Sequence, residues 1–500
     1  MNYLIGIDLG TQATKASLCD EQGTILADAV EESNLIHPEP GAVEQDPEEM
    51  LGSVLNTIKD VLEKSKISPS DVAGIGIDGQ MAGLLAVDES GRAAIPYDSW
   101  LDTRCGQSRK AFLDFGEERT IELTGAPVTY AHGPKIVWWR DERPEAYKRI
   151  HKFTQPGSYC AMRMCGLSGG DAFIDHTYLH FSGFADTERK CWSDELVEGI
   201  GIDKSKLPRI LRPWDRVGEV TSEMASRCGL IQGTPVVAGC GDTAGSTFGA
   251  GVVREGLMID VAGTASILAC AVKTFAPDKK YKTIMFAPSV AEGLYTPMAY
   301  INGGGMCIKW FRDDVTGKKY SYRELDEMAT SAPPGSDNLI FLPHFSGRVC
   351  PNDTLVRGSY VNLTWKHGAA HMFRAIMEGI AYEYGIYFDI INELVPGLKF
   401  DVVIGSGGGA KSELFTQIKA DVFGTPFSKS READTAALGC CAITGYGVGL
   451  YDSLTSLVTA PTEVWVSPNA ELYGHYNARK EVYAEIIESL HGVYDKLLSL

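Results

Sequence analysis

The chain has 500 residues, a hydrophobic fraction of 44% and a formal net charge of -19 at pH 7. This length exceeds what a single hydrophobic core supports and predicts two large domains. The acidic excess argues against a nucleic-acid partner, because binding to phosphates requires an excess of Lys and Arg. No apolar run approaches the roughly 18 residues that span a bilayer, so we expect no membrane partner.

The cysteines and the N-terminus indicate the compartment. The chain has 12 cysteines, which are scattered and form no CxxC pair. This pattern favours reduced, buried thiols over disulfides or a Cys/His metal site. A strand begins within three residues of the N-terminus, and the basic, apolar and small-residue series of a signal peptide is not visible. We therefore expect a cytoplasmic protein.

The first 90 residues predict a mixed sheet. Apolar patterns indicate strands at 3–8, 13–19, 24–30, 72–78 and 84–88. A helix is expected after the third strand, because Asp46 is a good N-cap and Pro47 suits the first helical position. Its apolar stripe comprises Leu51, Val54, Leu55, Ile58, Val61 and Leu62. The order of three strands, a helix and a strand is typical of a mixed sheet covered by helices.

The rest of the chain repeats this scheme after an elaboration at 96–235, which is richer in charge, Pro and aromatic residues. Strands are predicted at 234–242, 257–261, 266–272 and 400–407, and helices at 306–312, 370–393 and 472–497. The domain boundary is expected near residue 245, which gives domains 1–245 and 246–500. The chain has no Gly/Ser-rich linker, so the two domains are expected to pack and hinge.

Two similar turns are the most informative feature. Residues 4–15 read LIGIDLGTQATK and residues 257–267 read LMIDVAGTASI. Each is an apolar strand that runs into a Gly-Thr turn. Only the first has an acid two residues before its Gly, namely Asp8, where the second has Val261. Two such turns favour a pair of phosphate-holding hairpins.

The first turn carries the groups that a phosphate site needs. Gly10 allows close approach of the backbone, so successive N–H groups can hold phosphate oxygens. Lys15 and the hydroxyls of Thr11 and Thr14 supply further donors. Asp8 would repel bare phosphate and is therefore expected to hold Mg²⁺. The alternative is an ordinary glycine turn with a surface Asp.

A second acid lies in Gly239-Cys240-Gly241-Asp242-Thr243-Ala244-Gly245, at the end of a predicted strand. This is where open α/β sheets bind ligands. A carboxylate there can accept a hydroxyl proton during phosphoryl transfer from ATP. Asp242 could also be the N-cap of the next helix, and both interpretations can hold together.

Two further segments are candidates. Residues 405–412, GSGGGAKS, nearly match the P-loop pattern, but Ala410 replaces the required second Gly. A glycine platform beneath a purine ring is the better interpretation. Residues 100–104, WLDTR, combine an aromatic residue, an acid and a base, and could clamp a polyol or form a buried ion pair.

Taken in order, these motifs resemble the FGGY carbohydrate kinases, and the resemblance covers nearly the whole chain. The motifs are GIDLGT (6–11), EQDPEE (44–49), GQMAG (79–83), WLDTR (100–104), PKIVWW (134–139), GCGDTAG (239–245), AGTAS (262–266), KWFRD (309–313), FLPHFSG (341–347), AIMEGIAY (375–382), GSGGGAKS (405–412) and AALG (436–439). The GQMxG and GGGAKS segments are most similar to the xylulokinase branch. The resemblance implies an α/β fold of two actin-like (ribonuclease H-like) domains, with mixed sheets flanked by helices and an active-site cleft between them. It also implies ATP and Mg²⁺ as cofactors, a small-molecule sugar or polyol as substrate, and a possible homodimer.

The resemblance also implies roles for individual residues. Asp242 is expected to be the general base, and Asp8 and Asp242 to bind the metal. Phosphate groups are assigned to Thr11, Gln12, Lys15, Gly263 and Thr264, and adenosine to Gly305, Gly408, Gly409 and Ser412. The sugar pocket is assigned to Gln80, Met81, Ala82, Trp100, Asp102 and Thr243.

Three departures from the xylulokinase pattern leave the substrate open. Ala82 stands where those enzymes have a His that contacts sugar hydroxyls, and Thr243 follows Asp242 in place of Asn. Residues 167–183 lack the Asp-Ala-Ser motif that is more common in the family. The predicted reaction is transfer of the γ-phosphate of ATP to a ketopentose such as xylulose, or to a related sugar, polyol or sugar acid. The alternative is a catalytically silent, kinase-like sensor of sugar or nucleotide.

Overall fold

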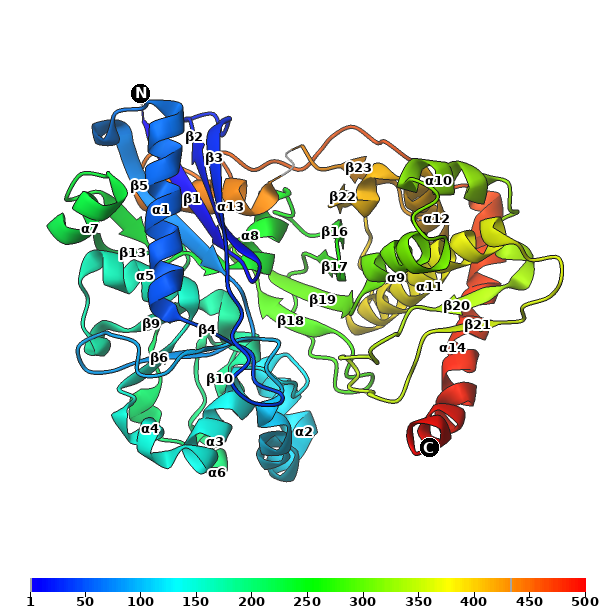
Figure 1. Ribbon diagram of the computed structural model, residues 1–500, viewed down its shortest axis with the longest axis horizontal. Coiled ribbons are helices and arrows are strands. Elements are labelled where there is room, and N and C mark those ends of the chain that lie inside the picture. Colours follow the sequence, from blue (N-terminus) through cyan, green and yellow to red (C-terminus); the bar gives the residue numbers. More distant parts are fainter. Residues whose placement is uncertain (1, 432–433) are drawn as a thin grey trace. The chain divides into compact units, whose positions relative to one another are not determined.

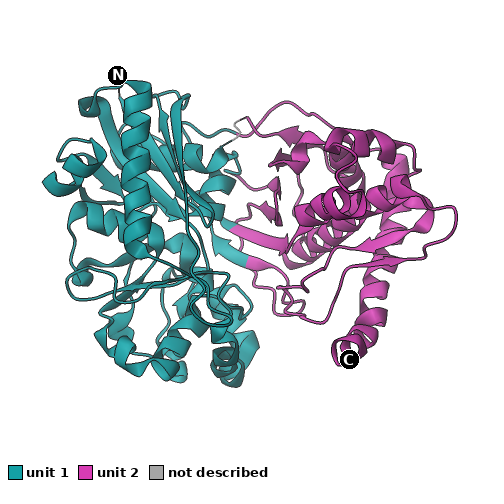
Figure 2. Cartoon of the chain, viewed as in Figure 1, with its two compact units in different colours: residues 1–253, 286–295, 434–459 teal, residues 254–285, 296–433, 460–500 magenta. Residues whose placement is uncertain are grey.

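The computed structural model describes residues 2–431 and 434–500 (Figure 1). The chain forms two compact units, coloured separately in Figure 2. Unit 1 comprises Met1–Val253, Phe286–Tyr295 and Asp434–Thr459, and unit 2 comprises Arg254–Met285, Thr296–Ala433 and Ala460–Leu500. The sequence predicts one boundary, between residues 245 and 246. In the structure the chain instead returns to unit 1 twice, at 286–295 and 434–459.

The main sheet of unit 1 has the order β13-β14-β5-β1-β2-β3, with β15 also paired to β5. The strands are β1 (Tyr3–Leu9), β2 (Ala13–Cys19), β3 (Ile25–Glu32), β5 (Val72–Gly79), β13 (Arg216–Glu219), β14 (Pro235–Val237) and β15 (Cys240–Gly241). β1 is antiparallel to β2 and parallel to β5, so the sheet is mixed, as the sequence predicts. The strand predicted at 234–242 is split into β14 and β15, because Gly239 adopts a positive φ of 76° between them.

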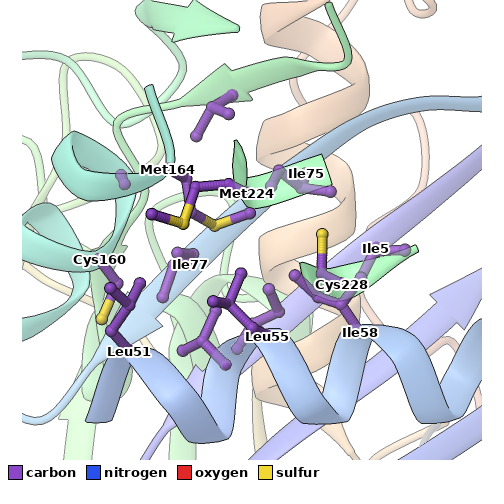
Figure 3. Close-up of a cluster of buried hydrophobic side chains, with 14 of the residues drawn as sticks. Ile5, Leu51, Leu55, Ile58, Ile75, Ile77, Cys160, Met164, Met224 and Cys228 are labelled. Carbon is purple, nitrogen blue, oxygen red and sulfur yellow. The ribbon is translucent and has the colours of Figure 1, made fainter. Parts of the chain in front are cut away.

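Helix α1 (Pro47–Ser65) covers one face of this sheet. The Asp46 side chain caps it by accepting the Glu48 N–H, and all six residues of the predicted apolar stripe are buried. Figure 3 shows Leu51, Leu55 and Ile58 of α1 against Ile5, Ile75 and Ile77 of the strands. Helices α5 (Pro156–Cys165) and α7 (Ser222–Cys228) complete this core through Cys160, Met164, Met224 and Cys228.

Helix α13 (Thr435–Gly447) covers the opposite face, and this explains why the chain returns to unit 1. A Cβ on Gly6 would lie 2.6 Å from the Ala437 carbonyl oxygen, and one on Gly76 2.3 Å from Thr444 Oγ1. Side chains alternate between the two faces of a strand, so these glycines face α13 while Ile5 and Ile77 face α1. The missing side chains allow the helix to approach the sheet closely.

The remaining elements of unit 1 surround this sheet. The paired strands are β4 (Glu44–Gln45) with β7 (Tyr97–Asp98), β6 (Leu85–Val87) with β8 (Lys152–Thr154), β9 (Phe173–Asp175) with β12 (Arg209–Leu211), and β10 (Ala185–Asp186) with β11 (Cys191–Trp192). The helices are α2 (Lys110–Thr124), α3 (His132–Glu142), α4 (Pro144–Arg149), α6 (Asp194–Ile200) and α8 (Asp242–Gly249). Short 3-10 turns occupy Pro69–Asp71, Arg104–Arg109, Gly169–Asp171, His176–Phe181 and Lys204–Lys206.

Unit 2 contains a second mixed sheet, with the order β19-β17-β16-β22-β23. Its strands are β16 (Leu257–Ala262), β17 (Ser266–Cys270), β19 (Tyr295–Ile301), β22 (Val402–Ser406) and β23 (Phe427–Lys429), and a separate pair is β20 (Ile340–Leu342) with β21 (Ser359–Val361). β18 (Met285–Pro288) begins where the chain leaves unit 2. As in the first sheet, the strand after the Gly-Thr turn is antiparallel to the strand before it.

The helices of unit 2 are α9 (Gly304–Trp310), α10 (Tyr322–Thr330), α11 (Ala369–Leu394), α12 (Glu413–Phe423) and α14 (Ala470–Leu498). α9 continues into a π-helical turn at Phe311–Val315, and 3-10 turns lie at Ser336–Asn338 and Gly409–Lys411. Within ranges 2–431 and 434–500, no helix is long and apolar enough to cross a membrane.

Candidate active site

Three ionisable residues lie side by side on neighbouring strands of unit 1. In the register of the sheet, Asp8 of β1 lies opposite Lys15 of β2 on one side and Asp78 of β5 on the other. Asp78 in turn lies opposite Cys240 of β15, two residues before Asp242. The sheet therefore brings carboxylates from the predicted phosphate hairpin and from a distant strand to the same edge.

The two adjacent carboxylates, Asp8 and Asp78, both hold a proton more strongly than an exposed carboxylate does. Burial, followed by the charge of Asp434, raises the pKa of Asp8 to about 6, although Asp78 and Lys15 act in the opposite direction. Asp78 is wholly buried, and burial together with Asp8 and Asp242 raises its pKa well above the usual range. Neither Asp78 oxygen accepts a hydrogen bond from a donor in the described part of the chain. The pair therefore favours one shared proton or a bound cation.

Asp242 is the first residue of α8, and Gly241, not Asp242, is the N-cap. Its Oδ1 accepts the Thr243 N–H at 2.5 Å and the Thr243 hydroxyl at 3.1 Å. Burial, then repulsion from Asp8, raises the pKa of Asp242 to about 7. The side chain is nevertheless partly exposed, so it can receive a proton from a bound ligand. Such a pKa suits a general base near neutral pH.

Lys15 is not a free cation. Its Nζ lies 2.5 Å from Oδ2 of Asp434, the N-cap of α13, whose Oδ1 accepts the Ala437 N–H. The ion pair connects the first hairpin to α13. The positive charge of Lys15 therefore lies directly beside the carboxylate of Asp434.

The Gly10-Thr11 turn is tied to the predicted sugar-binding residues. The Thr11 hydroxyl donates to Gln80 Oε1 at 3.1 Å and accepts the Trp100 indole N–H at 2.8 Å. Gln80 Nε2 donates to Gln45 Oε1 at 2.7 Å. The Gly10 N–H closes the turn on the Ala13 carbonyl, and the Ser33 N–H donates to the Gln12 carbonyl.

The segment after Gln80 is tightly constrained. Met81 is buried, and a Cβ on Gly241 would lie 2.5 Å from its sulfur, so Met81 lies beside the turn that carries Asp242. Ala82 is partly exposed and adopts a positive φ of 61°. Gly83 faces Tyr97, whose hydroxyl oxygen would lie 2.0 Å from an added Cβ. The structure thus brings Met81, Ala82 and Thr243 to the same part of unit 1 as Asp242.

Asp102 belongs to a buried ion pair, which decides between the two interpretations of the WLDTR segment. It is fully buried, and Arg104 Nε and the Val43 N–H donate to its Oδ2 at 2.8 and 2.9 Å. Arg104 also pairs with Glu39 and Glu44. The expected contact of Asp102 with a sugar is therefore corrected, because its oxygens are occupied and it has no exposed surface.

The predicted nucleotide residues gather at the carboxyl ends of β16 and β22 in unit 2. A Cβ on Gly305 would lie 2.0 Å from the Gly263 carbonyl oxygen, so α9 begins against the second Gly-Thr turn. A Cβ on Gly409 would lie 2.8 Å from the Ala262 side chain, whereas Gly408 faces open space and Thr264 is exposed. Ser412 caps α12 by accepting the Phe415 N–H.

The acids of unit 1 fit a metal that a phosphate helps to bind. Mg²⁺ is commonly held by one or two carboxylates, water and substrate phosphates. In the described ranges, no group of three His, Cys, Asp or Glu side chains could hold a metal alone. Asp8 and Asp242 nevertheless repel each other, and the nearby Lys15 is already paired with Asp434. A cation supplied with ATP would offset this surplus negative charge.

Comparisons with known proteins identify the family of this chain. The model of the N-terminal domain of the FGGY family of carbohydrate kinases matches residues 3–249, and that of the C-terminal domain matches residues 260–448. The chain belongs to the FGGY family of carbohydrate kinases. It is thus a sugar kinase, and carbohydrate kinases of this family use ATP and a divalent metal.

Individual relatives differ in the sugar that they are named for. Xylulose kinase of Lactococcus lactis is 28% identical over all of this chain and 99% of its own length. Ligand-bound xylulose kinase of Lactobacillus acidophilus superimposes with a TM-score of 0.89, at 25% identity over 99% of this chain and 100% of that chain. Gluconate kinase of the same organism gives a TM-score of 0.90, at 25% identity over 99% of both chains. The FGGY fold is therefore shown, among relatives that are named for both xylulose and gluconate.

Sequence reasoning missed two acids of this site, Asp78 and Asp434. A signal for Asp78 was present, because residues 75–78 repeat the IGID of residues 5–8 and the two copies lie in register in the sheet. Asp434 lies some 420 residues after Lys15 in the chain, and no local pattern connects the two. Only the return of α13 to unit 1 brings them together.

Proposed function

We propose that this FGGY kinase transfers the γ-phosphate of ATP to a hydroxyl of a ketopentose such as xylulose, or of a related polyol or sugar acid. Asp242 acts as the general base, and Asp8 is the main protein ligand of Mg²⁺. The observation that carries this proposal is the partly exposed Asp242 carboxylate, whose pKa is raised to about 7 beside Asp8.

The two carboxylates have separable tasks. Only one Asp242 oxygen is held by Thr243, so the other is left to accept the proton of the sugar hydroxyl as it attacks phosphorus. Asp8 orients the metal directly or through water, and Asp242 contributes to the same cation through its charge. Bound Mg²⁺ supplies neutralisation of phosphate charge. Protonated Asp242 cannot accept the hydroxyl proton, so turnover depends on its ionised form.

The phosphates and the adenosine are assigned to turns in both units. In unit 1 we propose Thr11, Gln12 and Lys15 as phosphate-binding residues, and in unit 2 Gly263 and Thr264. Gly305, Gly408 and Gly409 provide backbone without side chains for the nucleotide. Ser412 is proposed to support this site, because its hydroxyl caps α12.

Ala82 is the residue that bears most on the acceptor. It offers no donor at a partly exposed position next to buried Met81, where a His would offer one. We therefore expect Ala82→His to change the ratio of kcat/KM between xylulose and gluconate by about tenfold, which is the effect of one polar contact. The backbone accepts this change, because His is enriched at positive φ. An unchanged ratio would show that residue 82 does not contact the sugar.

The decisive experiment is an ADP-release assay across xylulose, ribulose, arabitol, erythritol and gluconate with MgATP. We expect one of these acceptors to raise ADP formation far above the rate without sugar, with a matching phosphorylated product by mass spectrometry. A silent sensor gives a different result: sugars raise the melting temperature but none stimulates ADP formation. That outcome would overturn the proposed reaction.

A further inference from the structure

The Thr11 hydroxyl is already engaged on two sides. It lies on the Gly-Thr turn that we assign to phosphate, but its hydrogen bonds are with the buried Gln80 and with Trp100, which we assign to the sugar. A Thr hydroxyl has one proton to donate and two lone pairs. Where that proton points therefore decides whether Thr11 can donate to a phosphate.

The orientation of the Gln80 amide fixes the direction of this proton. Gln80 Nε2 faces the Gly10 carbonyl at 3.5 Å and Gln45 Oε1 at 2.7 Å. A backbone carbonyl can only accept, so the NH₂ end of the amide must lie on that side. Gln80 Oε1 then faces Thr11 and must accept its proton. Gln45 and Gln80 are each only 1% exposed, which leaves no room for water to replace these partners.

The Trp100 indole N–H takes one of the two lone pairs of Thr11 Oγ1, because an indole N–H can only donate. The hydroxyl can thus offer a phosphate no proton, only its remaining lone pair, which a phosphate oxygen repels. The turn has other donors. The backbone N–H groups of Thr11 and Gln12 donate to no group in the described ranges and can bind an anion.

Trp100 depends on this contact for its orientation. Its side chain is exposed by 41%, and its N–H donates to Thr11 alone among the described residues. A large ring with that much exposure keeps a single rotamer only if its polar end is held. Thr11 is in turn held by the buried Gln80 and Gln45, so the chain of hydrogen bonds runs from the interior of unit 1 to the exposed indole.

We propose that the Thr11 side chain is a positioning residue for the sugar site, which holds the Trp100 indole in place, and that the turn binds phosphate through backbone N–H groups. The proposal rests on the proposed function, in that Trp100 contacts the acceptor sugar. It refines the part of Thr11 in that function, from a side-chain ligand of ATP to a support for the sugar pocket.

The test compares Thr11→Val, which keeps the shape but removes the hydroxyl, with Thr11→Ser, which keeps both hydrogen bonds. We expect Thr11→Val to raise the KM for the sugar about fivefold, as the loss of one neutral hydrogen bond does, and to leave the KM for ATP unchanged. Thr11→Ser restores the wild-type value. A rise in the KM for ATP with an unchanged KM for the sugar would overturn the proposal, because a phosphate ligand behaves in that way.

A double-mutant cycle with Trp100→Phe provides a second comparison. Thr11 acts through Trp100, so Thr11→Val is expected to have no further effect on the KM for the sugar once the indole N–H is gone. Additive effects of the two substitutions would contradict the coupling. If Thr11→Val does not fold, the smaller Thr11→Ala serves in the same cycle.

A spectroscopic measurement separates this proposal from the proposed function. The contribution of Trp100 to the fluorescence is obtained as the difference between each protein and its Trp100→Phe counterpart, without sugar or ATP. We expect acrylamide to quench this contribution more strongly in Thr11→Val than in the wild type or Thr11→Ser. Equal quenching in all three overturns the positioning role, whereas increased quenching without any sugar-stimulated ADP formation refutes only the proposed function.

Discussion

Replacing Asp242 by Asn is expected to stabilise the protein while it removes activity. Burial and Asp8 raise the pKa of Asp242 from 3.8 to about 7. This difference of about three pKa units corresponds to an upper limit of about 4 kcal/mol for keeping the carboxylate charged in the folded state. Asn keeps an oxygen for the Thr243 N–H and removes the charge. It also removes the general base, so turnover should fall by about 10²-fold or more.

The sign of the pH dependence follows from the raised pKa. Below the unfolded pKa of 3.8, Asp242 is protonated in both states and contributes its full stability. As the pH rises towards the folded pKa of about 7, the unfolded chain has lost the proton that the folded chain retains, and stability decreases. The gain in unfolding free energy of Asp242→Asn over the wild type should therefore begin at about pH 4. It should increase up to about pH 7 and remain constant above it.

The assay is calorimetric melting of wild type and Asp242→Asn across that pH range, together with ADP release. The matched control is Asp102→Asn, which removes a carboxylate that Arg104 and the Val43 N–H hold. The unfolding free energy of this control should be about 2 kcal/mol lower than that of the wild type, because its charged hydrogen bonds are lost. If Asp242→Asn melts at or below the wild-type temperature throughout, or keeps near-wild-type turnover, the argument for Asp242 is refuted.

Three further predictions concern packing, a buried charge and catalysis. Gly83→Ala should lower the unfolding free energy by about 1–3 kcal/mol in a denaturant melt, because its Cβ would meet Tyr97 at 2.0 Å. The control Gly52→Ala in α1 meets nothing and should not destabilise the protein. Lys419→Met should cost about 3–5 kcal/mol, because Asp260 is left buried without its cation, and adding Asp260→Asn should recover most of this loss. The kcat/KM should fall as the pH drops through about 7, where Asp242 takes up its proton, and a flat profile there would contradict its role as base.

Much of the fold could be predicted from local patterns. Helix α1 begins at Pro47 behind the Asp46 cap and buries the apolar stripe that the sequence predicts. The two Gly-Thr turns follow β1 and β16, as expected from apolar strands that run into glycine. These predictions succeed because strand and helix periods, and capping, are decided within a few residues.

Contacts between distant segments could not be predicted in this way. The sequence is equally compatible with Asp102 in a sugar clamp or in an ion pair, and the hydrogen bonds from the Val43 N–H and Arg104 decide for the pair. The return of α13 to unit 1 was not predicted, because the apolar sequence of a buried helix does not show which sheet the helix covers. The space for α13 is made by Gly6 and Gly76, which lie on two separate strands.

The sequence by itself determined the chemistry that is available: two Gly-Thr turns, an acid before the first, and Asp242 at the end of a strand. The tertiary structure decided which groups act on one another. The sheet register sets Asp8 beside Asp78, α13 brings Asp434 to Lys15, and the fold directs the Thr11 hydroxyl proton to Gln80. The physical reason is that a pKa or the direction of a hydrogen bond depends on neighbours within a few ångströms, and the sequence does not state which neighbours these are.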